Sequence, residues 1–253
     1  KFLQIMISKR IIAVLTFDNG ILTRTQNFEA DYTYTQNFVN NTLFDGIVLI
    51  DISKNNKNRN KFYRIVENFA KKCFVPICVG GKIKSISEVR KFQELGADKI
   101  LVNSLFITNK KLIKKIITTY GNQFIVVGID VKKINLKYSC FYKRGKVKIK
   151  SNLKKYLDEV NKFAPGEVLI QSIDRDGTFY GFDLEILKYF KKNLSCPVLV
   201  CGGGGNWSHF VSAFKDGNID GVCTNNIFHL TYQSILSAKE FCKKNSIDVR
   251  LEN

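Results

Sequence analysis

The residues best suited to chemistry in this sequence follow apolar runs of strand length. Asp130 ends the run FIVVGID, and a carboxylate placed directly after a buried strand is a candidate general acid or base. Asp51 ends a similar run, while Asp174 and Asp176 follow another in SIDRDGT. The alternative is that these carboxylates only order loops. That alternative stays open for Asp51 and Asp174, whereas Asp176 stands beside a glycine and indicates a binding role.

Two glycine-rich segments also follow apolar runs, and both are typical of anion sites. Gly80-Gly81 and Gly202–Gly205 each precede a helical pattern, and backbone N–H groups beside a helix N-terminus bind phosphate. Polar pairs end the next apolar run in each case, namely Asn103-Ser104 and Asn225-Asn226. The glycines alone would also fit tight turns. Because the whole pattern occurs twice, it favours two anion sites, as a substrate with two phosphate-like ends would need.

The two segments belong to an internal repeat. Residues 75–106 resemble residues 196–228, a shift of 121 positions at the start of each copy (75 to 196). Within the repeat, Lys82 stands where the second copy has Gly203. This lysine either adds a cation to the first anion site or fills the space that a phosphate needs.

The elements that must position these residues alternate along the whole chain. Apolar, β-branched runs of the kind buried on both faces of a parallel sheet lie at Arg10–Phe17, Gly46–Ser53, Val75–Gly81, Lys99–Ser104, Phe124–Lys132, Glu167–Asp174, Pro197–Gly203 and Gly221–Asn226. Amphipathic helical patterns separate them, and Ser85 with Glu88 forms a capping box for one helix. The pattern predicts an α/β fold: one (β/α)8 TIM barrel over residues 1–253, made of two fused half-barrels at about 9–120 and 121–250. An extra polar hairpin is expected at Leu136–Lys150.

The half-barrel relation sets Thr16 opposite Asp130, because RIIAVLT aligns on FIVVGID. A symmetric acid–base pair would need an aspartate at both positions. Threonine neither holds nor releases a proton near neutral pH. Any such pair is therefore reduced to one carboxylate.

Charged residues begin three of the predicted strands. Arg10, Lys99 and Glu167 would lie at the N-terminal end of the barrel, where charged side chains usually serve stability. If they point inward, they form a charged ring around the barrel axis and hence a gate.

The composition excludes several classes of protein. No run of about 20 apolar residues exists to span a membrane, and the first ten residues lack a signal-peptide cleavage site, so we expect a cytoplasmic protein. The seven cysteines form no CxxC pair, which favours free thiols, and neither metal nor cofactor is expected. The net charge of +18 comes from lysine pairs spread along the chain. That distribution speaks against nucleic acid as a partner and favours an anionic substrate.

The motifs together resemble one family, the HisF cyclase subunits of imidazole glycerol phosphate synthase. The resemblance runs from about Lys9 to Leu251 and is carried by KRIIAVL, LIDIS, VPICVGGKI, LGADKILVNS, VVGIDVK, GEVLIQSIDRDGT, CGGGGNWSHF, NIFHL and VRL. It implies a barrel that docks a HisH-like glutaminase on its N-terminal face, giving a heterodimer. Ammonia would pass through the barrel to the mouth and react there with a bisphosphorylated ribulosyl substrate.

The resemblance also implies roles for individual residues. The catalytic aspartate after the fifth strand falls on Asp130, and the mobile-loop lysine falls on Arg24. The gate falls on Arg10, Lys99 and Glu167, with Gly46 where the family has a fourth, acidic member. The phosphate contacts and neighbouring mouth positions fall on Gly81, Lys82, Asn103, Ser104, Gln171, Asp176, Gly177, Gly202, Gly203, Asn225 and Asn226.

Departures from the family pattern leave three functions open. The family's first catalytic aspartate is Thr16, a phosphate-loop glycine is Lys82, and two polar mouth positions are Gln171 and Cys201. These changes resemble paralogs from surface-polysaccharide gene clusters, which lack the first aspartate and are thought to supply ammonia to an N-acetyl sugar amidotransferase making acetamidino sugars. The alternatives are a true cyclase of histidine biosynthesis that tolerates Thr16 and a non-catalytic phosphate-binding scaffold.

Overall fold

Eight parallel strands close into a barrel in the computed structural model, which describes residues 8–26, 28–33, 44–224 and 235–251. Each strand pairs in parallel with the next in chain order, and the last pairs with the first. The barrel strands are β1 (Arg10–Asp18), β4 (Ile47–Asp51), β5 (Ile77–Gly80), β6 (Lys99–Val102), β7 (Ile125–Ile134), β10 (Glu167–Ser172), β11 (Val198–Cys201) and β12 (Gly221–Thr224). The predicted (β/α)8 class is confirmed.

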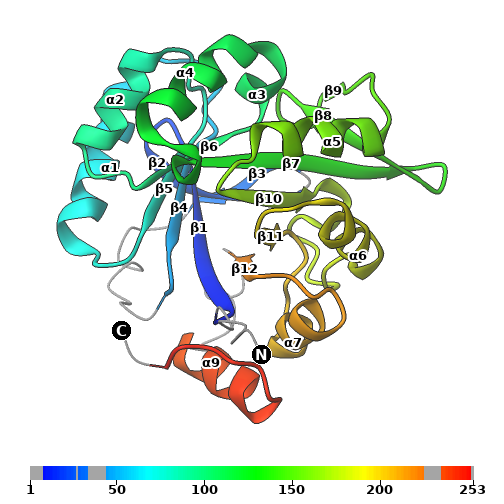
Figure 1. The fold of residues 1–253 in the computed structure, drawn as a ribbon. Helices are drawn as coiled ribbons and strands as arrows, with labels where there is room; N and C mark the ends of the chain where they lie inside the picture. The colour runs from blue at the N-terminus through cyan, green and yellow to red at the C-terminus, as the bar shows by residue number, and fades with distance from the viewer. Residues whose placement is uncertain (1–7, 27, 34–43, 225–234, 252–253) are drawn as a thin grey trace, which may run out of the picture.

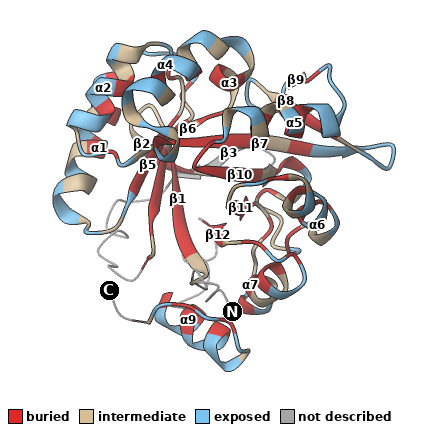
Figure 2. Cartoon of the chain, viewed as in Figure 1, coloured by how far each residue is buried: buried red, intermediate tan, exposed pale blue. Residues whose placement is uncertain are grey.

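Helices connect the strands and cover the outside of the barrel (Figure 1). Their outward faces are exposed while the strands are buried (Figure 2). Side-chain caps start several of them; for example, Ser85 Oγ accepts the N–H of Glu88 at 3.2 Å, which is one half of the predicted capping box, while Glu88 Oε2 accepts the N–H of Lys84 at 3.0 Å. The described helices are α1 (Arg59–Lys72), α2 (Ile86–Glu94), α3 (Ser104–Thr108), α4 (Lys110–Tyr120), α5 (Leu153–Phe163), α6 (Leu184–Asn193), α7 (Trp207–Lys215) and α9 (Ile235–Lys244), with short 3₁₀ turns at Asn122–Phe124 and Ile173–Arg175.

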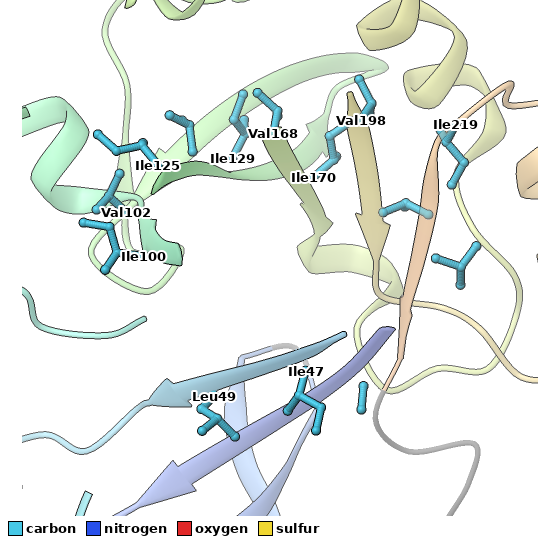
Figure 3. Packing of buried hydrophobic residues seen from close by; sticks show 14 of the residues in the cluster. Ile47, Leu49, Ile100, Val102, Ile125, Ile129, Val168, Ile170, Val198 and Ile219 are labelled. Carbon is cyan, nitrogen blue, oxygen red and sulfur yellow. The ribbon is translucent and has the colours of Figure 1, made fainter. Parts of the chain in front are cut away.

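Alternation along the strands divides the core into two layers. Side chains such as Ile47, Val127 and Val198 point outward and pack under the helices; Figure 3 shows part of this layer. The inward side chains form a separate cluster around the barrel axis: Ile12, Val14, Val48, Cys78, Val126, Leu169, Leu199, Cys201 and Cys223, with Ile50 and Leu101 packed against them. The barrel axis is therefore lined by apolar groups and thiols between its two ends.

Two antiparallel extensions leave the barrel at its C-terminal end. β1 turns directly into β2 (Ile21–Gln26), which pairs with β3 (Glu29–Thr33). β7 runs beyond the barrel and pairs with β8 (Lys137–Tyr142), which pairs with β9 (Val147–Lys148); this hairpin projects from the body of the molecule (Figure 1). The second extension contains the predicted hairpin, but it is not simply polar, because Cys140, Phe141 and Ile149 are buried.

Equivalent positions of the internal repeat make the same contact at the N-terminal end of the barrel. Asp98 accepts the N–H of Ile77 at 2.8 Å, and Asp220 accepts the N–H of Val198 at 2.8 Å. The donor residues lie 121 positions apart and the aspartates 122 apart (77 to 198 and 98 to 220). This shared contact supports our proposal that the barrel consists of two fused half-barrels.

None of the helices in the described part of the chain is long and apolar enough to cross a bilayer. Within the same residues, no group of three or more histidine, cysteine, aspartate or glutamate side chains is arranged to hold a metal ion.

Candidate functional site

The C-terminal mouth of the barrel contains a cavity of about 1200 Å³, and Asp130 on β7 lies on its wall. Burial, followed by the nearby charge of Asp176, raises the pKa of Asp130 to about 7. No hydrogen bond to its carboxylate is found among the described residues. A carboxylate with this pKa can accept or donate a proton near neutral pH, as general acid–base catalysis requires.

Thr16 lies on the wall of the same cavity, at the end of β1. Its hydroxyl donates a hydrogen bond to the carbonyl oxygen of Thr23 on β2, and the two residues are paired in the antiparallel register. The Thr16 side chain therefore attaches the β2–β3 hairpin to the barrel. Sequence reasoning placed this residue correctly in the mouth but did not anticipate its hydrogen bond.

The second anion-site candidate surrounds a smaller cavity of about 50 Å³. Its walls include the predicted residues Gln171, Asp176, Gly177, Cys201, Gly202 and Gly203. Asp176 accepts hydrogen bonds from the N–H of Phe28 at 3.0 Å and from the amide of Gln171 at 3.3 Å. Burial nevertheless raises the pKa of Asp176. The predicted partners Asn225 and Asn226 lie outside the described residues.

Arg24 brings a cation to this second candidate. Its guanidinium donates to the carbonyl of Gly177 at 3.5 Å and lies 5.3 Å from the ring centre of Phe179. Arg24 belongs to β2, so the hairpin held by Thr16 also carries this charge to the rim of the small cavity. The structure thus brings Arg24 together with Asp176 and Gly177, as the resemblance implied.

The first anion-site candidate opens into the large cavity, whose walls include Gly81, Lys82, Asn103 and Ser104. One detail of the sequence prediction was wrong, because β6 ends at Val102. Asn103 then precedes α3 and Ser104 is its first residue. Both residues consequently present their polar groups at a helix start instead of at a strand end.

The glycines of the two loops are required by close packing. Gly81 and Gly202 both have positive φ values, of 94° and 93°. A side chain at Gly81 would strike the carbonyl oxygen of Asp51, and one at Gly202 would strike that of Ser172. Each loop therefore lies against the end of the neighbouring strand. A tight turn packed in this way requires glycine, with or without a bound phosphate.

Lys82 already has a counterion in the structure. Its Nζ lies 3.1 Å from Asp51 Oδ2 and donates to the carbonyl of Asn55 at 2.5 Å. Arg59 contacts the same carboxylate oxygen at 2.7 Å. Burial alone would raise the pKa of Asp51, but hydrogen bonds from Ser53, Arg59 and Lys82 outweigh it and hold that pKa below its ordinary value.

Two of the predicted aspartates contact neighbouring groups that order loops. Asp51 pairs with the buried guanidinium of Arg59. The same guanidinium contacts Glu88 and the carbonyl of Gly81, so these groups form one network beneath the first loop. Asp174 accepts the backbone N–H of Lys133 at 2.8 Å. These contacts favour the loop-ordering alternative for both aspartates.

The charged residues at the N-terminal end form one cluster. Glu167 Oε1 lies 2.8 Å from Arg10 Nη1 and 2.8 Å from Lys99 Nζ. At Gly46, the nearest atom to an added side chain would be the carbonyl oxygen of Pro76 at 3.4 Å, so a side chain would have room there. The three predicted gate residues are thus brought together, with a gap on the β4 side.

Sequence reasoning missed two cationic residues at the mouth. Lys143 and Arg144, in the turn between β8 and β9, line the large cavity. The sequence shows them only as members of a basic hairpin, and nothing in the spacing indicates that the β8–β9 turn lies at the mouth of the barrel.

Comparisons with known proteins agree with this arrangement. The model of the family described as histidine biosynthesis protein matches residues 13–233. The chain is 36% identical over 251 residues to the imidazole glycerol phosphate synthase subunit HisF of Chlorobium phaeobacteroides, covering 97% of this chain and 100% of that protein. It is 37% identical over 253 residues to the HisF subunit of Clostridium botulinum strain Kyoto, with the same two coverages. The chain therefore belongs to the HisF family.

Proposed function

We propose that this protein is the synthase subunit of a glutamine amidotransferase. A HisH-like glutaminase would bind the N-terminal face and release ammonia at the cluster of Arg10, Lys99 and Glu167. The ammonia would cross the barrel and meet an acceptor at the mouth. The observation that carries the proposal is the order of groups along one axis: a charged cluster, an uncharged lining, and then Asp130 with its pKa near 7.

The lining suits neutral ammonia more than ammonium. Removing a cation from water into an apolar passage without a partner costs several kcal/mol, of order 5 or more. Ammonia carries no charge and escapes most of this cost. At the mouth, an ionised Asp130 would take up the proton that the nitrogen loses when it bonds to the acceptor.

We further propose that the acceptor at the mouth is an N-acetyl sugar or its activated derivative, shared with an associated amidotransferase and serving acetamidino-sugar synthesis. Thr16 is the observation behind this choice. Its hydroxyl donates a hydrogen bond to Thr23, so the position opposite Asp130 supplies no titratable group, whereas a symmetric acid–base pair would need one there. A cyclisation that needs both groups would be slow.

The second candidate is the cyclase reaction of histidine biosynthesis. The names of the relatives favour it, since each of those proteins is an imidazole glycerol phosphate synthase subunit. Asp130 also supports it, because it is available for acid–base work in either reaction.

The rate of ammonia-dependent turnover of the ribulosyl bisphosphate substrate distinguishes the two candidates. We expect slow turnover by the wild type and a faster rate for Thr16→Asp, which restores a second carboxylate. Thr16→Val serves as the control, because it removes the hydrogen bond to Thr23 without adding an acid. A wild-type rate in the ordinary enzymatic range of about 1–1000 s⁻¹ would contradict the sugar-amidation proposal.

A further inference from the structure

The two anion-site candidates differ in size and in charge. The small cavity, of about 50 Å³, has polar and apolar walls with Asp176 as their charged residue. The large cavity, of about 1200 Å³, is lined by five cationic side chains (Lys54, Lys82, Lys84, Lys143 and Arg144) and by three aspartates (Asp18, Asp51 and Asp130). The small cavity has a cation beside it, Arg24, so the large cavity offers more room and more cations to an anionic group.

Most of these cations are available to a ligand. Lys82 is paired with Asp51, whose charge is also met by Arg59. Among the described residues, the other four lining cations form no ion pair with a carboxylate. Asp18 and Asp130 also line the cavity, but the four cations come from two separate parts of the chain, the segments after β4 and β5 and the β8–β9 turn. A ligand with more than one phosphoryl group can contact both sets.

The turn that carries Lys143 and Arg144 is held in a fixed position at the cavity rim. Lys143, Arg144 and Gly145 have consecutive positive φ values of 51°, 62° and 71°, a conformation that side chains rarely adopt. The N–H of Lys143 donates to Ser104 Oγ at 3.0 Å, and the amide of Asn103 donates to the carbonyl of Phe141 at 3.4 Å. The turn is thus attached to the very residues expected at the first anion site.

A second observation at the same place indicates a ligand. Asn103 Oδ1 is buried and has no hydrogen-bond partner, and leaving a buried acceptor unsatisfied is costly. Asp130, on the same cavity wall, is also without a donor among the described residues. Two lining residues with unsatisfied acceptors, in a cavity that cations also line, fit a ligand that has both hydroxyl or amine donors and an anionic group.

We propose that the turn at Lys143 and Arg144 is a specificity-determining anion clamp, and that the acceptor carries a diphosphate at this end. Lys82 and Lys84 after β5 and Lys54 after β4 form one wall of the clamp. The β8–β9 turn forms the other. A phosphoanhydride presents two phosphoryl groups, one for each wall. The inference rests on the proposed function for treating the mouth as the acceptor site.

Calorimetric titration of the full chain with inorganic pyrophosphate and with inorganic phosphate, at low salt and without divalent cations, tests the clamp. We expect pyrophosphate to bind at least about tenfold more tightly. The double variant Lys143→Ala, Arg144→Ala should weaken pyrophosphate binding about tenfold, since each exposed contact to a charged group contributes up to about fivefold. It should change phosphate binding much less.

The control is Lys137→Ala, Lys148→Ala, which removes the same charge from exposed positions of β8 and β9 that do not line the cavity. It should leave both affinities unchanged. Equal affinities of the wild type for the two anions would overturn the proposal, as would an equal loss in the control variant. The titration needs neither glutaminase nor turnover. Its result is therefore independent of the tests of ammonia transfer, and either proposal can be refuted without the other.

Discussion

Replacing Asp130 by asparagine should abolish ammonia-dependent chemistry and at the same time stabilise the folded protein. Burial raises the pKa of Asp130 from its ordinary value of 3.8 to about 7. Ionising this group therefore costs more in the folded chain than in the unfolded one. Asparagine has nearly the same size and carries no charge, so the variant avoids that cost and loses the acid–base group.

The sign of the pH dependence follows from the two pKa values. Below a pH of 3.8, the pKa of this group in the unfolded chain, Asp130 is protonated in both the folded and the unfolded protein and does not lower the stability. Between 3.8 and about 7 the folded chain keeps a proton that the unfolded chain has lost, so wild-type stability falls as pH rises. Above a pH of about 7 the unfolding free energy falls no further, and the total decrease has an upper limit of about 4 kcal/mol.

Urea unfolding of both proteins from pH 5 to pH 8 measures this difference. The advantage of Asp130→Asn in unfolding free energy should grow by about 2–3 kcal/mol over that interval. Ammonia-dependent activity of the wild type should rise across the same interval, as the carboxylate becomes available as a base. A stability difference that does not change between pH 5 and pH 8 would refute the assignment of Asp130 as a buried, unpaired carboxylate.

Two further predictions concern the N-terminal end of the barrel. Glu167→Gln leaves two cations without their shared carboxylate; we expect a loss of about 1–3 kcal/mol in urea unfolding and a lower ratio of glutamine-supported to ammonia-supported activity. An unchanged ratio would remove this cluster from the ammonia path. Asp98→Ala and Asp220→Ala each leave a strand N–H unpaired and should each cost about 1–2 kcal/mol, with Asp220→Ala the more costly because Asp220 also pairs with Lys191 at 2.5 Å. A negligible cost at either position would count against equivalent roles in two half-barrels.

The barrel was predictable because its strands are buried on both faces and read as continuous apolar runs. Asp130 was predictable for a related reason: a carboxylate directly after such a run must lie at the mouth. The repeat also predicted that the two glycine loops correspond to each other. In the structure, Gly81 and Gly202 have nearly equal φ values, of 94° and 93°.

The β1–β2 hairpin shows what sequence reasoning overlooked. Asn19 and Gly20 have φ values of 52° and 82°, and the residues that flank them, Asp18 and Ile21, are paired. An Asn-Gly between two strand-forming runs is a strong hairpin signal. Applied here, that rule would have predicted the hairpin and placed Thr23 opposite Thr16.

Other features depend on contacts between distant parts of the chain. Lys82 pairs with Asp51, 31 positions earlier (51 to 82), so no local pattern could decide whether its charge is free. Lys143 lies at the mouth because its N–H bonds to Ser104 on another element. Local propensity predicts a hairpin at this place but not the direction in which it folds.

The most direct test of ammonia passage through the barrel uses glutamine labelled with ¹⁵N in its amide group. The complex of this protein with a HisH-like glutaminase from the same source is supplied with labelled glutamine, an excess of unlabelled ammonium and the acceptor. Our account predicts a product that carries ¹⁵N despite the unlabelled excess, because ammonia reaches Asp130 from within. A product whose nitrogen matches the ammonium in solution would contradict it.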